Sequence, residues 1–431
     1  MVIDNPILLA LNICTLVVII FSANLLILRA FERQTYLPLA MCLLAIGIII
    51  CQPTVAVFQQ SLQPVFLILS LPAILLIAPS FWFYVQGLTS ETPWHFSKKS
   101  FRHFIPCGIG AFIALLTFAM PTEISHALLV EGNEDILATT HVVLRYIIYG
   151  MLITVFALVL GWVVQSGIYF YKIIQRLNSY RTHLKDLFAS TETKEIRWLT
   201  WLLVAVGGVW LATAVNLVLD NLFFTSELDA LLSNAVILVM IWSLALWGLR
   251  QKPGFEELYN NQDDFLDDIA YDAISKQISE TSNNAATTEE SETKASTSQT
   301  NTNAPQTKYQ RSALDQQHAD KIAAKIENAM QNDELYLDSS LSLQKLAKHI
   351  HTSPNYISQT LNETLGMNFF DYVNKYRVEA AKQHLIQTSD TVLDIAMNVG
   401  FNAKSSFYTA FKKETQQTPS QFRKKSSVTS Q

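Results

Sequence analysis

The sequence predicts an all-α protein in three parts: seven membrane-spanning helices, a disordered linker, and two helix-turn-helix units joined by a long helix. Three observations lead to this prediction. Apolar runs fill the first 250 of the 431 residues, and a polar, low-complexity stretch follows them. The last part consists of short periodic helices that repeat at an offset of about 50 residues. We place the three domains at residues 1–252, 253–307 and 308–431.

The first domain is predicted from segments long enough to cross a bilayer. A spanning helix needs about 20 predominantly apolar residues, and seven segments meet this requirement. They cover residues 6–28, 36–58, 64–86, 104–120, 141–164, 198–220 and 231–249. Charged residues follow the first segment and no small-residue cleavage site is present, so we interpret it as a span and not as a signal peptide.

Lysine and arginine are distributed asymmetrically between the connections of these segments. One set of connections carries thirteen of them, for example Lys98, Lys99 and Arg102, whereas the alternate set carries none. Cytoplasmic loops collect lysine and arginine. With seven spans, this asymmetry predicts an external N-terminus and a cytoplasmic location for everything after residue 250.

The residue types within the spans argue against several classes of membrane protein. Transporters and proton pumps usually place ionisable groups at mid-membrane, and the span interiors contain almost none. No span contains a lysine for a retinal Schiff base, and HExxH, GxSxG and P-loop patterns are absent. The four cysteines lie in apolar runs without CxxC spacing, which predicts neither disulfides nor zinc. We therefore predict no enzyme activity, no catalytic residues, no metal and no cofactor.

The linker, 253–307, is polar and acidic. It contains eleven acidic residues against Lys276 and Lys294, and its low complexity predicts disorder. Near its start, apolar residues have near-helical spacing: Phe255, Leu258, Phe265, Leu266 and Ile269. This spacing is equally consistent with an amphipathic helix that pairs two copies into a homodimer and with a solvated acidic spacer.

Short helices with strong boundary signals are expected in the C-terminal domain. Ser312 is a candidate N-cap for a helix with Ile322, Ile326 and Met330 on one face. The first helix-turn-helix unit is predicted at 342–366, the connecting helix at 368–386 and the second unit at 392–415. In the first unit, boundary signals are Ser353 as N-cap, Pro354 in the first turn and Gly366 after the helix.

An internal repeat makes the helix-turn-helix prediction specific. Leu346 and Ala347 match Ile395 and Ala396 at an offset of 49 residues. At an offset of 50, Ile357, Leu361 and Tyr372 match Phe407, Phe411 and Phe422. One helix-turn-helix is a weak signal, because two packed helices are common, but two in tandem are much more specific.

Geometry and charge both agree with binding to double-stranded DNA. The connecting helix is nearly 30 Å long at about 1.5 Å per residue, close to the roughly 34 Å of one DNA turn. One chain could therefore place two recognition helices in successive major grooves. Residues 340–431 contain eleven basic and six acidic side chains, a net charge of +5 that favours phosphate contact.

Residues 312–425 resemble the DNA-binding domain of AraC/XylS-type transcription regulators. The stretches that carry the resemblance are LAKHIHTSPNYISQTLNETLG, NKYRVEAAKQHL and DIAMNVGFNAKSSFYTAFKKETQQTPSQFR. The preceding spans and linker are similar to membrane-anchored members, which implies a location in the bacterial inner membrane. The family pattern implies that the first turns of the two recognition helices contact bases. The implied base-contacting residues are Asn355, Ser358, Gln359, Lys404, Ser405, Ser406 and Thr409.

Other residues of these helices are assigned to phosphate contacts or to the core. We expect Lys412, Lys413 and Arg423 to contact phosphates. Helical spacing predicts that a second set is buried: Tyr356, Ile357, Leu361, Phe407 and Phe411. The chain departs from the family pattern at Gln416, where glycine is usual, and at Ala403, whose capping role we assign to Asn402. These differences affect sequence preference more than binding.

Three functions remain in competition. The leading hypothesis is a one-component regulator whose membrane domain senses an unknown ligand or stimulus and whose tethered domain binds promoter DNA. In the second, the membrane domain is only an anchor, and proteolysis of the linker releases the DNA-binding domain. In the third, a transporter-like bundle carries a regulatory tail, which the ion-poor spans disfavour.

Overall fold

The computed structural model describes residues 6–129, 132–133, 135–191, 196, 198–205, 207, 227–255 and 316–429. It falls into two compact units, Met1–Ser179 with Ile196–Glu256 and Tyr180–Glu195 with Glu257–Gln431. Within the described ranges the secondary structure is helical, without a strand and with one isolated bridge. The all-α prediction is confirmed. The predicted linker and the candidate cap Ser312 lie almost entirely outside the described residues.

The first unit is a bundle of long apolar helices. Its main helices are α1 (Pro6–Ala30), α2 (Leu37–Phe58), α3 (Gln63–Leu88), α4 (Ile105–Phe118), α7 (Val142–Leu187) and α9 (Glu227–Arg250). Short 3-10 turns lie at Gln34–Tyr36, Gln60–Leu62 and Lys98–Phe104. Prolines in the first turns of α2, α3 and α4 lack an N–H that a helix start leaves unpaired anyway, and therefore favour these starts.

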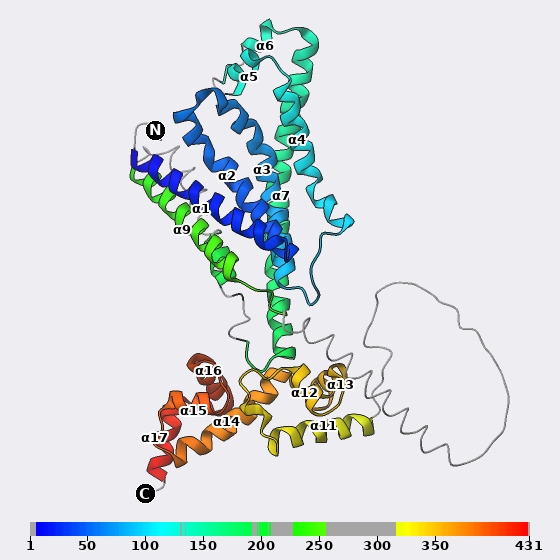
Figure 1. Ribbon diagram of the computed structural model, residues 1–431, viewed down its shortest axis with the longest axis vertical. Helices are drawn as coiled ribbons and strands as arrows, with labels where there is room; N and C mark the ends of the chain where they lie inside the picture. The colour runs from blue at the N-terminus through cyan, green and yellow to red at the C-terminus, as the bar shows by residue number, and fades with distance from the viewer. Residues whose placement is uncertain are drawn as a thin grey trace, which may run out of the picture. The chain divides into compact units, whose positions relative to one another are not determined.

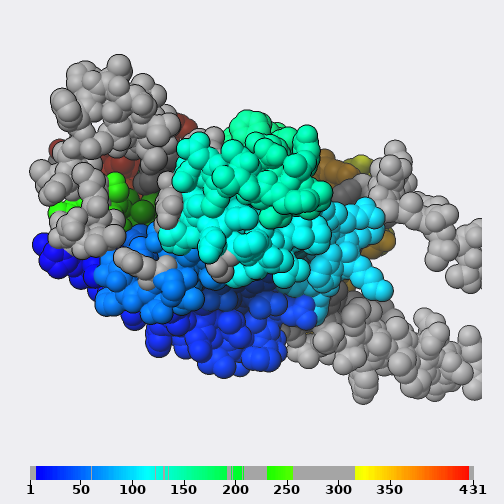
Figure 2. Space-filling view, turned by 90° about the horizontal axis from the view of Figure 1, so that it is seen from above, coloured from blue at the N-terminus to red at the C-terminus, as the bar shows by residue number. Residues whose placement is uncertain are grey.

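These helices pack in a regular order. Successive helices from α1 to α4 contact each other, and α9 packs along α1 although residues 31–226 separate them in the chain (Figure 1). The short helices α5 (Thr122–Leu129) and α6 (Ile136–Thr139) lie at one end of the unit (Figure 1), which Figure 2 shows from above. The helix α5 contacts α3.

Six described helices are long and apolar enough to cross a membrane, and they correspond to six of the seven predicted spans. The remaining one, 198–220, lies mostly outside the described residues. The helix α7 differs from its prediction. It contains 46 residues, or about 69 Å at 1.5 Å per residue, whereas a bilayer core is about 30 Å thick. The predicted span 141–164 is therefore only its first half, because the helix continues through the charged residues that follow.

The second unit contains two small cores that share one helix. Its helices are α11 (Gln316–Gln331), α12 (Leu343–His349), α13 (Pro354–Gln359), α14 (Phe369–Gln387), α15 (Val392–Asn398), α16 (Lys404–Thr415) and α17 (Pro419–Thr429). A 3-10 turn, η4, covers Leu335–Leu337, and a π-helical turn, η5, covers Thr360–Thr364. As predicted, the buried face of α11 carries Ile322, Ile326 and Met330.

The helix α14 joins the two cores (Figure 1). Its first half contributes Phe369, Tyr372 and Val373 to the core around α11, α12 and α13. Its second half contributes Val378, Ala381 and Leu385 to the core around α15 and α16. Because each helix-turn-helix unit packs on its own half of α14, this helix sets the separation between them.

Candidate nucleic-acid interface

The first recognition helix is α13, which follows α12 after a four-residue turn. Its Asn355 is exposed, while Ser358 and Gln359 are half-buried. The Gln359 side-chain amide donates to Glu363 Oε2 at 2.9 Å. Beyond Gln359 the backbone changes to η5, and Gly366 has a φ of +64°. The predicted left-handed end at Gly366 is confirmed, but the helix changes from α to π geometry before it.

The second recognition helix, α16, is longer and regular. Lys404, Ser405 and Thr409 are exposed, and Ser406 is half-buried. The Ser406 hydroxyl donates to the Ala403 carbonyl at 2.7 Å, and the Thr409 hydroxyl donates to the Ser405 carbonyl at 2.9 Å. Since each hydroxyl uses its proton within the helix, its oxygen lone pairs remain for donors on a base edge.

The core residues beneath these helices are largely as predicted. Ile357, Leu361, Phe407 and Phe411 have no exposed surface. Tyr356 was predicted to be buried, and this is wrong, because 37% of its surface is exposed. Its ring makes an edge contact with His318 of α11, at 6.1 Å between ring centroids. Tyr356 therefore lies at the border between the two helices instead of beneath them.

The basic side chains of this unit have different surroundings. Lys412 is exposed. Lys413 forms an ion pair with Asp371 at 2.7 Å, and Arg423 donates to the carbonyls of Leu385 and Asp390 at 3.2 and 2.8 Å. Arg377, one of the eleven basic residues of 340–431 whose charge was taken to favour phosphate contact, is completely buried. Its spacing from Val373, Ala381 and Leu385, all multiples of four, is the sequence signal that it belongs to the inner face of α14.

The N-termini of the recognition helices differ from those of the supporting helices. Side chains of Ser342, Asn368 and Thr391 cap α12, α14 and α15 by accepting a backbone N–H. Ser353 and Ala403, at the starts of α13 and α16, make no such bond. First-turn N–H groups without a side-chain cap can bind an anion such as a DNA phosphate.

Two expectations about the ends of α16 have clear outcomes. Asn402 does not cap the helix, so that assignment is wrong. Its side-chain amide donates to the Ser339 carbonyl at 3.0 Å, and Ala403 is the N-cap. Gln416 ends the helix in the left-handed conformation with a φ of +58°, and its side-chain amide donates to the Lys413 carbonyl at 3.1 Å.

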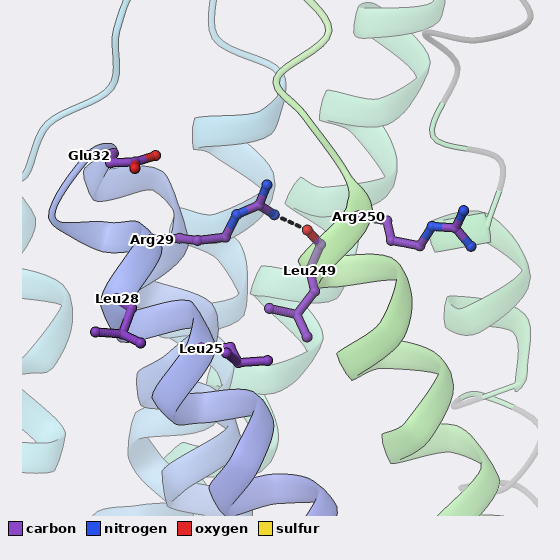
Figure 3. A pocket seen from close by; sticks show the side chains of 6 residues that line it. All are labelled: Leu25, Leu28, Arg29, Glu32, Leu249 and Arg250. Atoms are coloured by element: carbon purple, nitrogen blue, oxygen red, sulfur yellow. Dashed lines mark hydrogen bonds between the residues drawn. The ribbon is translucent and has the colours of Figure 1, made fainter.

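The first unit contains an open pocket of about 570 Å³ between the ends of α1 and α9 (Figure 3). Its lining residues are Leu25, Leu28, Arg29, Glu32, Leu249 and Arg250. Arg29 donates to the Leu249 carbonyl, and its guanidinium lies 5.1 Å from the centroid of the Tyr36 ring. These contacts hold α1 against α9, so we assign this pocket to helix packing. Within the described ranges no group of three or more His, Cys, Asp or Glu residues is placed to hold a metal.

Comparison with known proteins supports the assignment of the second unit. A family model described as a helix-turn-helix domain matches residues 346–425. An uncharacterized HTH-type transcriptional regulator of Staphylococcus aureus (strain COL) is 39% identical over 90 residues, which is 21% of this chain and 12% of that protein. The bifunctional transcriptional activator/DNA repair enzyme AdaA of Bacillus subtilis (strain 168) is 39% identical over 97 residues, which is 22% of this chain and 46% of that protein.

Among solved structures, the C-terminal domain of the two-component response regulator yesN from Fusobacterium nucleatum matches at 35% identity and a TM-score of 0.22. The match covers 24% of this chain and 98% of that chain. The chain thus spans less than half the length of each curated relative named above. The helix order, the tandem repeat and the family model agree on one assignment. Residues 346–425 of this chain form a helix-turn-helix domain of the AraC type.

Proposed function

We propose that this protein is a membrane-embedded, one-component transcription regulator. Its two helix-turn-helix units bind specific sequences in promoter DNA, and its apolar helices place it in the bacterial inner membrane and receive the stimulus. The observation that best supports this proposal is the presence of two recognition helices, α13 and α16, in one domain. Each has an exposed first turn, and each packs with its own half of α14.

The geometry of α14 supports binding of both units to one duplex. The helix has 19 residues, or about 28 Å at 1.5 Å per residue, close to the roughly 34 Å between successive major grooves. We assign base contacts to Asn355, Ser358 and Gln359 in α13, and to four residues in α16: Lys404, Ser405, Ser406 and Thr409. Asparagine and glutamine suit adenine, and lysine suits guanine.

The apolar helices and the charge asymmetry support the membrane location. Six described helices meet the length and composition of a span, and lysine and arginine lie on one set of connections. That set includes the residues after 250, and this supports a DNA-binding domain on the cytoplasmic side. Pairing of two chains would raise the local concentration of binding domains at adjacent sites. The ion-poor spans and the absence of catalytic motifs support a role without enzyme activity.

Genome-wide mapping of bound sites tests this proposal. The full chain should occupy a defined set of sites that share a sequence, and Asn355→Ala and Lys404→Ala should each reduce occupancy. Lys321→Ala, which removes an exposed lysine from α11, is the matched control and should leave occupancy unchanged. A full chain that binds without sequence preference would contradict the proposal. A soluble C-terminal fragment that appears on stimulation would instead support release by proteolysis.

A further inference from the structure

Arg377 lies at the centre of the second unit and holds several chain segments together. Its side chain is completely buried. It donates to the carbonyls of Tyr336 and Asp338 at 2.7 and 2.8 Å. It also donates to the Ser190 hydroxyl at 3.1 Å and to the Ala189 carbonyl at 3.3 Å. A buried guanidinium is costly unless its donors are satisfied, so each of these acceptors contributes to keeping Arg377 in place.

The loop that accepts from Arg377 is also the contact between the two helix-turn-helix units. We call residues 336–342, between α11 and α12, the junction loop. Asn402 of the second unit donates to the Ser339 carbonyl at 3.0 Å, and the Phe401 ring centroid lies 5.6 Å from the Arg377 guanidinium. A Cβ on Gly400 would lie 2.5 Å from the Tyr336 carbonyl oxygen. The junction loop therefore fixes the second unit relative to the first.

Lys345 and Ser340 stabilise the junction loop. Both donate to the Asp338 carboxylate, at 2.9 and 2.7 Å. Burial alone would raise the pKa of Asp338, but these hydrogen bonds and the charge of Lys345 hold it below its usual value. The carboxylate is therefore anionic at neutral pH, and the loop keeps the shape that presents its carbonyls to Arg377.

A third segment reaches the same loop from the membrane helix. The end of α7 and the residues after it, Tyr180–Glu195, belong to the second unit. Phe188 pairs with Ser342 in an antiparallel bridge, and the Ala189 N–H donates to the Leu341 carbonyl at 3.1 Å. Phe188 and Ala189 are almost completely buried, and Ala189 is part of the core formed by α11, α12 and α13.

We propose that Phe188–Ser190 is a docking segment through which the membrane unit controls DNA binding: when docked on the junction loop, it holds the two helix-turn-helix units at the spacing that binds DNA. The inference rests on the proposed function and adds its mode of regulation. Since α7 is one continuous helix from Val142 to Leu187, a shift of its apolar part acts on a segment that begins one residue after its end.

Two observations indicate that the docked state, and not the released state, binds DNA. The docking segment contacts the junction loop and leaves Asn355, Lys404 and Ser405 exposed, so the docked state does not block the DNA-binding surface. Release of the segment would remove two acceptors from Arg377, which is the group that ties the junction loop to α14. The docked state is therefore the state that binds DNA. Release of the segment loosens the fixed spacing between the two helix-turn-helix units.

Cross-linking in the full-length protein tests the docking. Directly opposed residues of an antiparallel bridge have Cα atoms roughly 4.5–5.5 Å apart, within the range of a disulfide. Phe188→Cys combined with Ser342→Cys should therefore form an intramolecular disulfide on mild oxidation in membrane vesicles. Each single variant, which loses the same side chain, is the control. A yield no higher than that of the single variants would overturn the proposal.

Measurements of DNA binding test whether docking of Phe188–Ser190 regulates the DNA-binding domain. The probe is a duplex that the unmodified full chain, in lipid nanodiscs, selects from a random library. The cross-linked protein should bind it as tightly as the unmodified chain. Ser190→Ala should weaken binding by up to roughly tenfold, because it removes one hydrogen bond from Arg377. Ala189→Trp, which is too large for its buried site, should weaken binding further and prevent cross-linking.

Lys185→Gln is the matched control, because Lys185 is exposed near the end of α7, just before the docking segment, and it should bind as the unmodified chain does. Loss of binding on cross-linking, or normal binding by Ala189→Trp, would overturn the inference. Failure of the unmodified chain to select any duplex would contradict the proposed function. The cross-linking yield would still report docking in that case, so the two failures are distinguishable.

Discussion

The two helix-turn-helix units use the same turn with different residues. In the first, Thr352 N–H donates to the Ala347 carbonyl at 3.0 Å, and His351 has a φ of +49°. In the second, Phe401 N–H donates to the Ala396 carbonyl at 3.0 Å, and Gly400 has a φ of +93°. The hydrogen bond and the left-handed residue before it occupy equivalent positions, at an offset of 49 residues.

The difference between the turns comes from what surrounds them. His351 is exposed, so its side chain extends into solvent and only the modest strain of a left-handed residue remains. A Cβ on Gly400 would lie 2.5 and 2.8 Å from the carbonyl oxygens of Tyr336 and Leu337. The left-handed backbone conformation alone does not require glycine in this turn, because His351 adopts it too. Glycine is required at position 400 because the second unit lies so close to the junction loop.

Loss of Arg377 should have the largest effect, because both units depend on it. Arg377→Met would leave the buried carbonyls of Tyr336 and Asp338 without their donor, at a cost of about 3–5 kcal/mol in the free energy of unfolding. Hydrogen exchange of the full chain should then show lost protection in α12 and α16 together. Arg377→Lys separates the effect of charge from that of hydrogen-bond geometry, because lysine keeps the positive charge but lacks the planar guanidinium and its several N–H donors. Near-normal protection in Arg377→Lys would show that charge alone maintains the junction.

Substitution at the two turns should separate strain from steric conflict. Gly400→Ala should cost about 2–4 kcal/mol, because it adds a left-handed residue and a clash with the junction loop. His351→Gly, at the equivalent exposed position, should change stability by less than about 1 kcal/mol, since relief of strain is offset by greater freedom of the unfolded chain. Hydrogen-exchange protection in α15 and α12 measures the two effects. Equal effects at both positions would remove the steric explanation.

Much of this arrangement could be predicted from sequence because the repeat carries helix boundaries and core positions together. The pattern of Leu346, Ile357 and Leu361 repeats, with one residue inserted in the turn, in Ile395, Phe407 and Phe411, and all six are buried. Contacts between segments remote in sequence could not be predicted in this way. Neither the docking of Ala189 nor the donation from Asn402 to Ser339 leaves a periodic signal, because each depends on where another segment lies. For the same reason, the charge count of residues 340–431 did not distinguish the buried Arg377 from the exposed basic residues.

The residues proposed to contact bases in the two units should act on different halves of the DNA site. Asn355→Ala and Lys404→Ala should each cost about 1–3 kcal/mol in binding free energy and relax sequence preference at the contacted base. The affected bases should lie about one helical turn apart, at roughly 10 base pairs. Binding to a set of single-base variants of the selected duplex measures this. Relaxation by both variants at the same base would mean that the two units do not bind successive grooves.

Substitution of Ala403, at the uncapped start of α16, should have the smallest effect. The direction of its effect on DNA binding depends on the charge of the new side chain. Ala403→Ser adds a candidate cap, which stabilises a helix by about 1 kcal/mol. Ala403→Asp adds a similar cap but also a negative charge at N–H groups that could otherwise bind a DNA phosphate. Both variants should therefore gain protection in α16 by hydrogen exchange, while Ala403→Asp should bind the duplex less tightly than Ala403→Ser at low salt. The difference should diminish as salt increases, because phosphate contacts are screened. Equal affinity of the two variants at low salt would show that no phosphate lies at this helix start and that base contacts alone position α16.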